Sequence, residues 1–154
     1  MLKWRRASRR DLPLLASWNR RLIVDEKADT PRGLAFLQLR MGRWLSGSYR
    51  AVLFFEDKTP VAYALYRVQL AGIYIRQLYV DRPYRRRGVG RSAVRLLLWK
   101  VFPKRKVIDV DVLLHNKRGM AFWHAQGFKD RVMRMARPGR AAKPAKRKGK
   151  SGKL

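Results

Sequence analysis

An arginine- and glycine-rich loop in the middle of the chain has the residue types of an anion-binding site. The loop runs from Val80 to Gly90 with the sequence Val-Asp-Arg-Pro-Tyr-Arg-Arg-Arg-Gly-Val-Gly, between an extended stretch over Ile73–Val80 and an apolar-periodic segment over Val89–Val101. A helix N-terminus offers unpaired backbone N–H groups and the positive end of the helix dipole to an anion. Glycine has no Cβ, so the backbone at Gly88 and Gly90 can approach a phosphate closely. The spacing therefore predicts a phosphate-binding loop between a strand and a helix.

Hydrophobic periodicity predicts the elements that hold this loop in place. A capping box at Ser8 and Asp11 begins the first helix, and Asn116 caps the last. The expected strands are Leu2–Ala7, Tyr49–Glu56, Val61–Gln69, Ile73–Val80, Val107–Leu114 and Phe128–Met135, and the expected helices are Leu12–Ile23, Leu34–Leu45, Gly88–Val101 and Lys117–Gln126. A strand–helix–strand crossover makes its two strands parallel, whereas hairpins make the other neighbours antiparallel. We therefore expect an α/β (α+β) fold: a mixed, mostly antiparallel sheet with a central parallel β-α-β crossover and helices on both faces.

The composition excludes several kinds of chemistry. The chain has 154 residues, no cysteine and two histidines, His115 and His124, which we interpret as surface or core residues rather than catalysts. A disulfide, a thiol nucleophile and a Cys-ligated zinc site are therefore impossible, and we expect no metal. No apolar run approaches the roughly 18 residues of a membrane span, and the N-terminus lacks the apolar region of a secretory signal. The sequence predicts a cytoplasmic protein that does not enter a membrane.

Positive charge is distributed over the whole chain, and the formal net charge is +28. Residues 136–154 contain eight Lys and Arg and no acid, so residues 1–135 still carry +20. A segment this charged and poor in apolar residues cannot bury a core, so we expect one domain over 1–135 and a basic, disordered tail over 136–154. Between Arg82 and Lys106 there are ten basic residues and no acidic one. Such a chain attracts polyanions.

Two motifs resemble those of the GCN5-related N-acetyltransferase (GNAT) superfamily. After a strand that ends in Leu78-Tyr79-Val80, the loop Arg85-x-x-Gly88-x-Gly90 is similar to the family's acetyl-CoA motif. Downstream, Asn116-x-x-Gly119-x-x-Phe122-Trp123-x-x-x-Gly127-Phe128 resembles the family pattern Asn-x-x-Ala-x-x-Phe-Tyr-x-x-x-Gly-Phe. The two motifs stand in the family's order, and the resemblance covers residues 1–135. It implies a GNAT-like acetyltransferase domain that uses acetyl-CoA as co-substrate.

The resemblance also implies where acetyl-CoA would bind. The backbone of the strand end would pair with the pantetheine arm, amides from Arg86 to Arg91 would hold the pyrophosphate, and the helix after Asn116 would form the opposite wall. The implied donor-site residues are Leu78, Tyr79, Val80, Arg85, Arg86, Arg87, Gly88, Val89, Gly90, Arg91, Asn116, Phe122 and Trp123.

The implied reaction is N-acetylation of a primary amine by direct attack on the thioester in a ternary complex. Without cysteine there is no covalent Cys intermediate. Trp123 departs from the family, because many members have a tyrosine there as the acid that protonates the leaving thiolate. An indole N–H donates hydrogen bonds but is no usable acid. A thiol of pKa near 8.5 can leave as thiolate near neutrality, so we expect weak dependence on an acid, with water, Tyr79 or Tyr84 as substitutes.

Acceptor recognition is predicted less directly. In similar proteins the loop between the first two helices borders the acceptor site, and here it contains Asp25, Glu26 and Asp29. These acids either hold a cationic amine or are ordinary exposed loop charges, and Asp111 is interpreted as structural. The acceptor is a small molecule or a protein, and the sequence allows a monomer or a homodimer.

A second function competes with the enzyme. The basic domain and tail suit non-specific binding to nucleic acid or to a ribosome, with acetyl-CoA binding vestigial or regulatory. Against this, the chain contains no recognised nucleic-acid motif, and no aromatic residues are interleaved in the tail.

Overall fold

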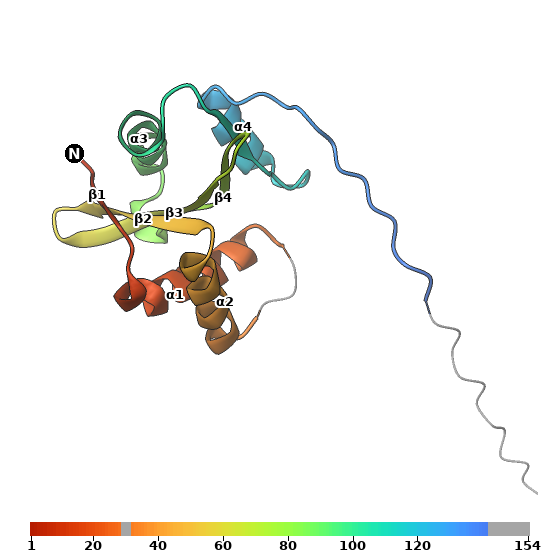
Figure 1. Ribbon diagram of the computed structural model, residues 1–154, viewed down its shortest axis with the longest axis horizontal. Coiled ribbons are helices and arrows are strands. Elements are labelled where there is room, and N and C mark those ends of the chain that lie inside the picture. Colours follow the sequence, from red (N-terminus) through yellow and green to blue (C-terminus); the bar gives the residue numbers. More distant parts are fainter. Residues whose placement is uncertain (29–31, 142–154) are drawn as a thin grey trace, which may run out of the picture.

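Helices cover both faces of a five-stranded sheet in the computed structural model, which describes residues 1–28 and 32–141. The strands are β1 (Lys3–Arg6), β2 (Tyr49–Glu56), β3 (Thr59–Val68), β4 (Gly72–Val80) and β5 (Val107–Val110). The α-helices are α1 (Leu12–Asp25), α2 (Leu34–Ser46), α3 (Val89–Leu96) and α4 (Lys117–Ala125), and the short helical turns are η1 (Arg9–Asp11), η2 (Arg82–Tyr84) and η3 (Leu97–Val101). In Figure 1, α1 and α2 lie together on one side of the sheet and α3 on the other.

The sheet has the order β1-β2-β3-β4-β5. All neighbouring strands are antiparallel except β4 and β5, which are parallel and joined through α3. The mixed, mostly antiparallel sheet with a parallel β-α-β crossover is therefore confirmed. Because β5 is the last strand of the described sheet, the crossover lies at the edge of the sheet and not at its centre, where the sequence predicted it.

Two apolar clusters attach the helices to the sheet. Trp18, Leu22 and Met41 of α1 and α2 pack with Tyr63 and Tyr79 of the sheet. On the other face, the cluster is formed by Val52, Phe54, Ala64, Tyr66, Ile73 and Ile75 of the sheet with Val89, Ala93, Val94 and Leu97 of α3 and η3 and Trp123 of α4. Alternation along the strands sends successive side chains to these two clusters, which confirms the prediction of helices on both faces.

The predicted helix over Gly88–Val101 continues as expected but changes its hydrogen bonding. Phe102 N–H donates to Leu97 O at 2.8 Å, five residues back, so η3 is a π-helical turn. The predicted capping box is also present, since Ser8 N–H donates to the Asp11 carboxylate at 2.7 Å. It begins η1, and α1 follows directly.

Two strand predictions at the C-terminal end are wrong. The strand predicted over Val107–Leu114 ends at Val110, and residues 128–135 form no strand. Side-chain contacts replace a ladder there: Asp130 contacts His124 at 2.6 Å, and Arg131 pairs with Asp109 at 3.0 Å. Beyond these contacts the chain runs away from the sheet (Figure 1) with Val132, Met133 and Met135 exposed.

The tail prediction falls mostly on residues that the structure does not describe. Residues 136–141 are exposed and form neither helix nor strand, and residues 142–154 lie outside the described ranges, so disorder of the tail stays a prediction. Within the described ranges, every helix is too short or too polar to cross a membrane.

Candidate active site

The arginine- and glycine-rich loop forms a tight connection between β4 and α3. The Asp81 carboxylate accepts a hydrogen bond from Arg82 N–H at 3.0 Å and so caps η2. Two residues then have a positive φ, Arg86 at 63° and Gly88 at 76°. Glycine adopts this conformation without a steric penalty. Gly88 stands immediately before α3, and an added Cβ there would meet no atom within 4 Å, so the backbone conformation itself requires the glycine.

This turn leaves a continuous run of amide groups without acceptors. Within the part of the chain that the structure describes, no hydrogen bond uses the backbone N–H groups of residues 86–91, and the first bond of α3 is from Ser92 N–H to Gly88 O at 3.0 Å. Such groups at a helix N-terminus suit the oxygens of a phosphate or pyrophosphate.

The free edge of β4 starts where β5 stops pairing. β5 pairs only with Gly72–Ile75, so the rest of β4 has no strand on that side among the described residues. Asp81 N–H donates to Val61 O on β3, and alternation therefore points the backbone of Leu78 and Val80 toward the open edge. Tyr79 is paired with Tyr63, so its backbone faces β3. Two of the three predicted residues can present backbone groups to a ligand there.

Arg85 forms a hydrogen bond with one of these backbone groups, the Val80 carbonyl, and links the loop to α1. Its Nε donates to Val80 O at 2.8 Å, and its guanidinium binds Asp25 at 2.7 Å and lies 5.2 Å from the centre of the Tyr79 ring. The Val80 carbonyl thus already has a donor. Leu78 and the Val80 N–H remain available to an extended ligand.

The two motifs touch at a glycine. A Cβ added to Gly90 would lie 3.1 Å from the Phe122 ring and 3.6 Å from Val80, so glycine there lets α3 approach α4 closely. The Asn116 amide oxygen accepts from Gly119 N–H at 3.0 Å and caps α4. Trp123 is buried and packs edge-to-face with Phe122 and Phe128, which makes it a core residue.

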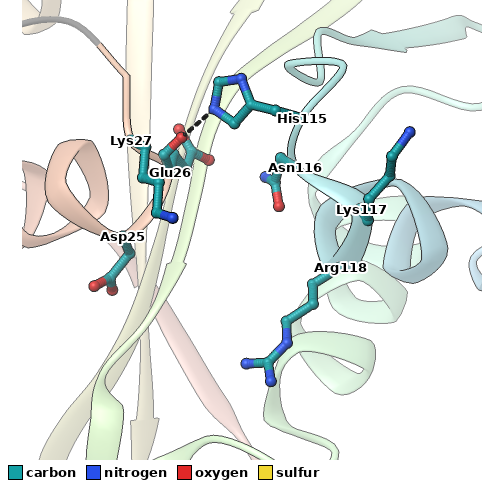
Figure 2. Close-up of a pocket in the computed structure, with 7 residues that line it drawn as sticks. All are labelled: Asp25, Glu26, Lys27, His115, Asn116, Lys117 and Arg118. Atoms are coloured by element: carbon teal, nitrogen blue, oxygen red, sulfur yellow. Dashed lines mark hydrogen bonds between the residues drawn. The ribbon is translucent and has the colours of Figure 1, made fainter.

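A pocket of about 530 Å³ lies between the end of α1 and the start of α4. Its lining residues are Asp25, Glu26, Lys27, His115, Asn116, Lys117 and Arg118. Figure 2 shows the first three on one side and the last three on the other, with His115 reaching across. The His115 Nε2–H donates to the Glu26 carbonyl at 2.8 Å, because a carbonyl can only accept. This contact joins segments that are 89 residues apart.

The end of α1 fixes the position of Glu26. Lys27 has φ 47°, its N–H donates to Val24 O, and Ala28 N–H donates to Ile23 O. These bonds form a Schellman motif, in which glycine usually takes the left-handed position. Burial raises the pKa of the Glu26 carboxyl, the nearby negative charge of Asp25 raises it further, and His115 opposes the shift. Glu26, in the wall of the pocket, therefore keeps its proton to a higher pH than an exposed carboxyl does.

Asp25 has a different environment from its neighbour. Arg82 and Arg85 bind its two carboxylate oxygens at 2.9 and 2.7 Å. Burial favours the neutral form, but the hydrogen bonds from Arg85 and Arg82 outweigh it and lower the pKa of Asp25. Two arginines of the arginine- and glycine-rich loop neutralise its charge, which disfavours the predicted role in holding a cationic amine. Asp29, the third acid of that prediction, lies outside the described residues.

The two tyrosines named as substitute acids are already engaged. Tyr79 is buried, its ring lies tilted against Trp18 with the centroids 5.6 Å apart, and its hydroxyl donates to Asp81 at 3.1 Å. Burial raises its pKa, Arg21 opposes this, and Asp81 raises it further. The Tyr84 ring lies 5.6 Å from the Arg87 guanidinium, which also reaches Glu56 at 3.5 Å.

Asp111 accepts a hydrogen bond from the Tyr74 hydroxyl at 2.9 Å, which agrees with a structural role for Asp111.

With this geometry in place, comparison with known proteins identifies the class. Residues 12–128 match the Acetyltransferase (GNAT) family, and the chain belongs to that family. No curated protein sequence matches the chain significantly.

Solved structures with the same fold are only distantly similar in sequence. A possible acetyltransferase from Clostridium difficile 630 has a TM-score of 0.73 and 17% identity, over 92% of this chain and 99% of its own. A predicted acetyltransferase with acetyl-CoA from Clostridium acetobutylicum gives 0.69 and 18%, over 90% and 96%. The ribosomal-protein-S18-alanine N-acetyltransferase from Escherichia coli gives 0.65 and 20%, over 86% and 80%. At these identities the likeness establishes the fold alone.

Three features of the site escaped the sequence: the Asp25 pairing with two arginines, the contact of Gly90 with Phe122, and the bridge from His115 to Glu26. Only the last had a usable signal, because His115 directly precedes a residue assigned to the site. The donor-site residues otherwise lie where the motifs put them in the chain, and their binding role stays a prediction.

Proposed function

We propose that this protein is an N-acetyltransferase that transfers the acetyl group of acetyl-CoA to a primary amine by direct attack in a ternary complex. The observation that carries the proposal is the run of unpaired N–H groups over residues 86–91 beside the open edge of β4. A pyrophosphate has only acceptors to offer, and an amide-containing arm can pair with a strand edge. Acetyl-CoA contains both a pyrophosphate and an amide-containing pantetheine arm, so the N–H groups of residues 86–91 and the open edge of β4 fit it.

Acetyl-CoA supplies a thioester whose carbonyl carbon bonds to the amine nitrogen while the C–S bond breaks and coenzyme A leaves as thiolate. The chain contributes a backbone N–H of Leu78 or Val80, which faces the open edge and can stabilise a developing oxyanion. Because Trp123 is a core residue without an acidic proton, the thiolate leaves without help from that position. Tyr79 and Tyr84 stay weak candidates for protonating it.

The amine proton goes to Glu26 in this proposal. A neutral amine is required, and a lysine-like amine of pKa about 10.4 is almost fully protonated near neutrality. Glu26 lines the pocket, has a raised pKa and is the carboxylate there without an arginine partner among the described residues. It can accept the proton directly or through one water. Asp25 instead positions Arg82 and Arg85.

The test has two stages. Titration with acetyl-CoA by calorimetry should show saturable binding, and incubation with acetyl-CoA and a panel of amines (α-amino peptides, lysine peptides, polyamines and small amines) should release thiol with at least one class. Absence of binding would contradict the donor site. Binding without thiol release from any amine would favour the competing function, in which acetyl-CoA is regulatory.

A further inference from the structure

One tryptophan of this chain is far more exposed than the other four. Trp99, on η3, is 75% exposed. Trp18, Trp44 and Trp123 each lie against another aromatic ring, whereas no ring or guanidinium contacts Trp99 within residues 1–28 and 32–141. Trp4, on β1, also lacks such a contact among these residues, but it is only 37% exposed. Most of the Trp99 indole surface is therefore open to a partner.

The cations that lie near Trp99 in the sequence also lack partners. Arg95, Lys100, Lys104 and Arg105 are all exposed, and we call them, with Trp99, the α3 patch. None of the four forms an ion pair in the described part of the chain, although Arg5, Arg21, Arg82, Arg85, Arg87 and Arg131 all do. No acidic residue occurs between Arg82 and Lys106 to compensate them. Their counterions come from solvent and would be released by a polyanion.

The α3 patch is separate from the donor site. The side of α3 and η3 that packs on the sheet carries Val89, Ala93 and Leu97. Arg95 and Trp99 are four residues apart, on the solvent side of the same continuous helix. Trp99 also lies nine residues beyond Gly90, about 13 Å along the helix at 1.5 Å per residue. Acetyl-CoA held at residues 86–91 does not account for the α3 patch.

We propose that the α3 patch binds single-stranded RNA, with Trp99 stacked on a base and the four cations on backbone phosphates. Every base has a flat face that an aromatic side chain can cover, and cations beside it follow the backbone. A duplex does not offer such faces, because its bases are stacked on one another. An anionic membrane fits less well, because interfacial binding needs a broad apolar helix face rather than one ring among cations. RNA is the nucleic acid whose loops and ends present unpaired bases.

The stacking contact is tested by fluorescence anisotropy with the full chain and a labelled, mixed-sequence single-stranded RNA of about 16 nucleotides. Trp99→Ala should weaken binding about 10-fold, because one base–aromatic stack is lost. Trp99→Phe keeps a ring and should recover most of the affinity. Both variants should bind acetyl-CoA as before and unfold at the unchanged temperature, because the side chain is exposed.

The charges are tested with a matched pair of double variants. Arg95→Gln with Lys100→Gln should reduce the slope of log Kd against log salt by about 1.4, since each lost single-strand contact contributes about 0.7. Arg20→Gln with Arg43→Gln removes the same charge from exposed positions on α1 and α2, across the sheet, and should change the slope much less. Because both double variants retain the tail, the comparison isolates the α3 patch.

Several results would overturn the proposal. One is equal loss of affinity in the two double variants, which would mean that net charge alone attracts the RNA. Another is a Trp99→Ala variant that binds like the unaltered chain. Tighter binding of duplex or single-stranded DNA of the same sequence, or phosphatidylserine vesicles that bind with the same dependence on Trp99, would assign the α3 patch to another partner.

Discussion

The proposed donor loop and the proposed acceptor pocket are neighbours built in opposite ways. The loop over residues 85–91 offers mainly backbone groups, and its shape follows from a glycine of positive φ and a helix start. The pocket offers side chains from α1 and from the start of α4, which lie about 90 residues apart in the chain. A backbone site is encoded locally, whereas a side-chain site requires the fold to bring its parts together.

Asp25 and Glu26 make the same contrast within two adjacent residues. Asp25 belongs to the donor loop through Arg82 and Arg85, and its pKa is lowered. Glu26 belongs to the pocket, where burial raises its pKa. Adjacent acids of like charge thus have opposite pKa shifts, and substitutions at the two positions should have separable effects.

The largest expected effect is on the acceptor side. Glu26→Gln should lower kcat/KM for the amine about 100-fold, the lower range for loss of a general base, while the Kd for acetyl-CoA stays unchanged. With the unaltered chain, kcat/KM should rise with pH through the raised pKa of Glu26, and this limb should vanish in the variant. The pH profile also contains the titration of the amine itself. Comparing amines of different pKa separates the two, because the part of the profile due to the amine shifts with the amine pKa, whereas the part due to Glu26 does not.

Stability distinguishes a lost base from a damaged fold. A carboxyl whose pKa is raised in the folded state costs stability once pH exceeds that pKa, and costs nothing below the unfolded value. Glu26→Gln should therefore unfold at the same or a higher temperature at pH 7. A Glu26→Gln variant that retained full activity would remove Glu26 from the proposed chemistry.

The next effect tests the donor loop with two glycines of similar geometry. Gly88 and Gly127 have φ values of 76° and 90°, and a Cβ on either would meet nothing within 4 Å. Replacing either glycine with alanine should lower folding stability by about 1 kcal/mol, because both residues have a left-handed backbone conformation. Only Gly88→Ala should also weaken acetyl-CoA binding, about 10-fold by calorimetry, because the strained turn displaces the amides after it. Equal Kd values for the two variants would contradict the donor loop.

A smaller effect is expected at Asp25. Asp25→Asn should lower folding stability by about 1 kcal/mol at neutral pH, the scale of a partly exposed ion pair, and change the acceptor KM less than about 2-fold. A lowered carboxyl pKa stabilises the fold above the unfolded value, near 3.9, and this stabilisation is lost as pH falls through the folded pKa. Chemical unfolding at pH 7 and at about pH 3 should therefore show a smaller difference from the unaltered chain at the lower pH. A large change in acceptor KM would instead show that Asp25 takes part in recognising the amine.

The smallest effect on turnover is expected at Trp123. Trp123→Phe keeps a ring in the cluster with Phe122 and Phe128, and kcat should stay within about 3-fold, because the indole supplies no catalytic proton. Steady-state thiol release measures this. Loss of turnover with intact acetyl-CoA binding would show that position 123 contributes to the chemistry after all.

The sequence predicted the described elements well where periodicity and caps were strong, and failed at the C-terminal end. The strand predicted over residues 128–135 contains apolar residues, but it reaches β5 only through the Arg131–Asp109 side-chain pair and forms no ladder. A strand is stable only within a ladder. Along β4 the sequence identified the right stretch. It did not show that Tyr79 turns its backbone to β3 while Leu78 and Val80 face the open edge, because register depends on the partner strand.

By itself, the sequence determined the order of the elements, the family and the position of the donor loop, because capping, helix periodicity and a left-handed glycine are local requirements of the backbone. Only the tertiary structure decided which of the two acids in the pocket wall is paired with arginines. Asp25 meets Arg82 and Arg85 across 57 and 60 residues, and His115 meets Glu26 across 89. Charge pairing and burial set the pKa of each carboxyl, and both exist only once the chain has folded.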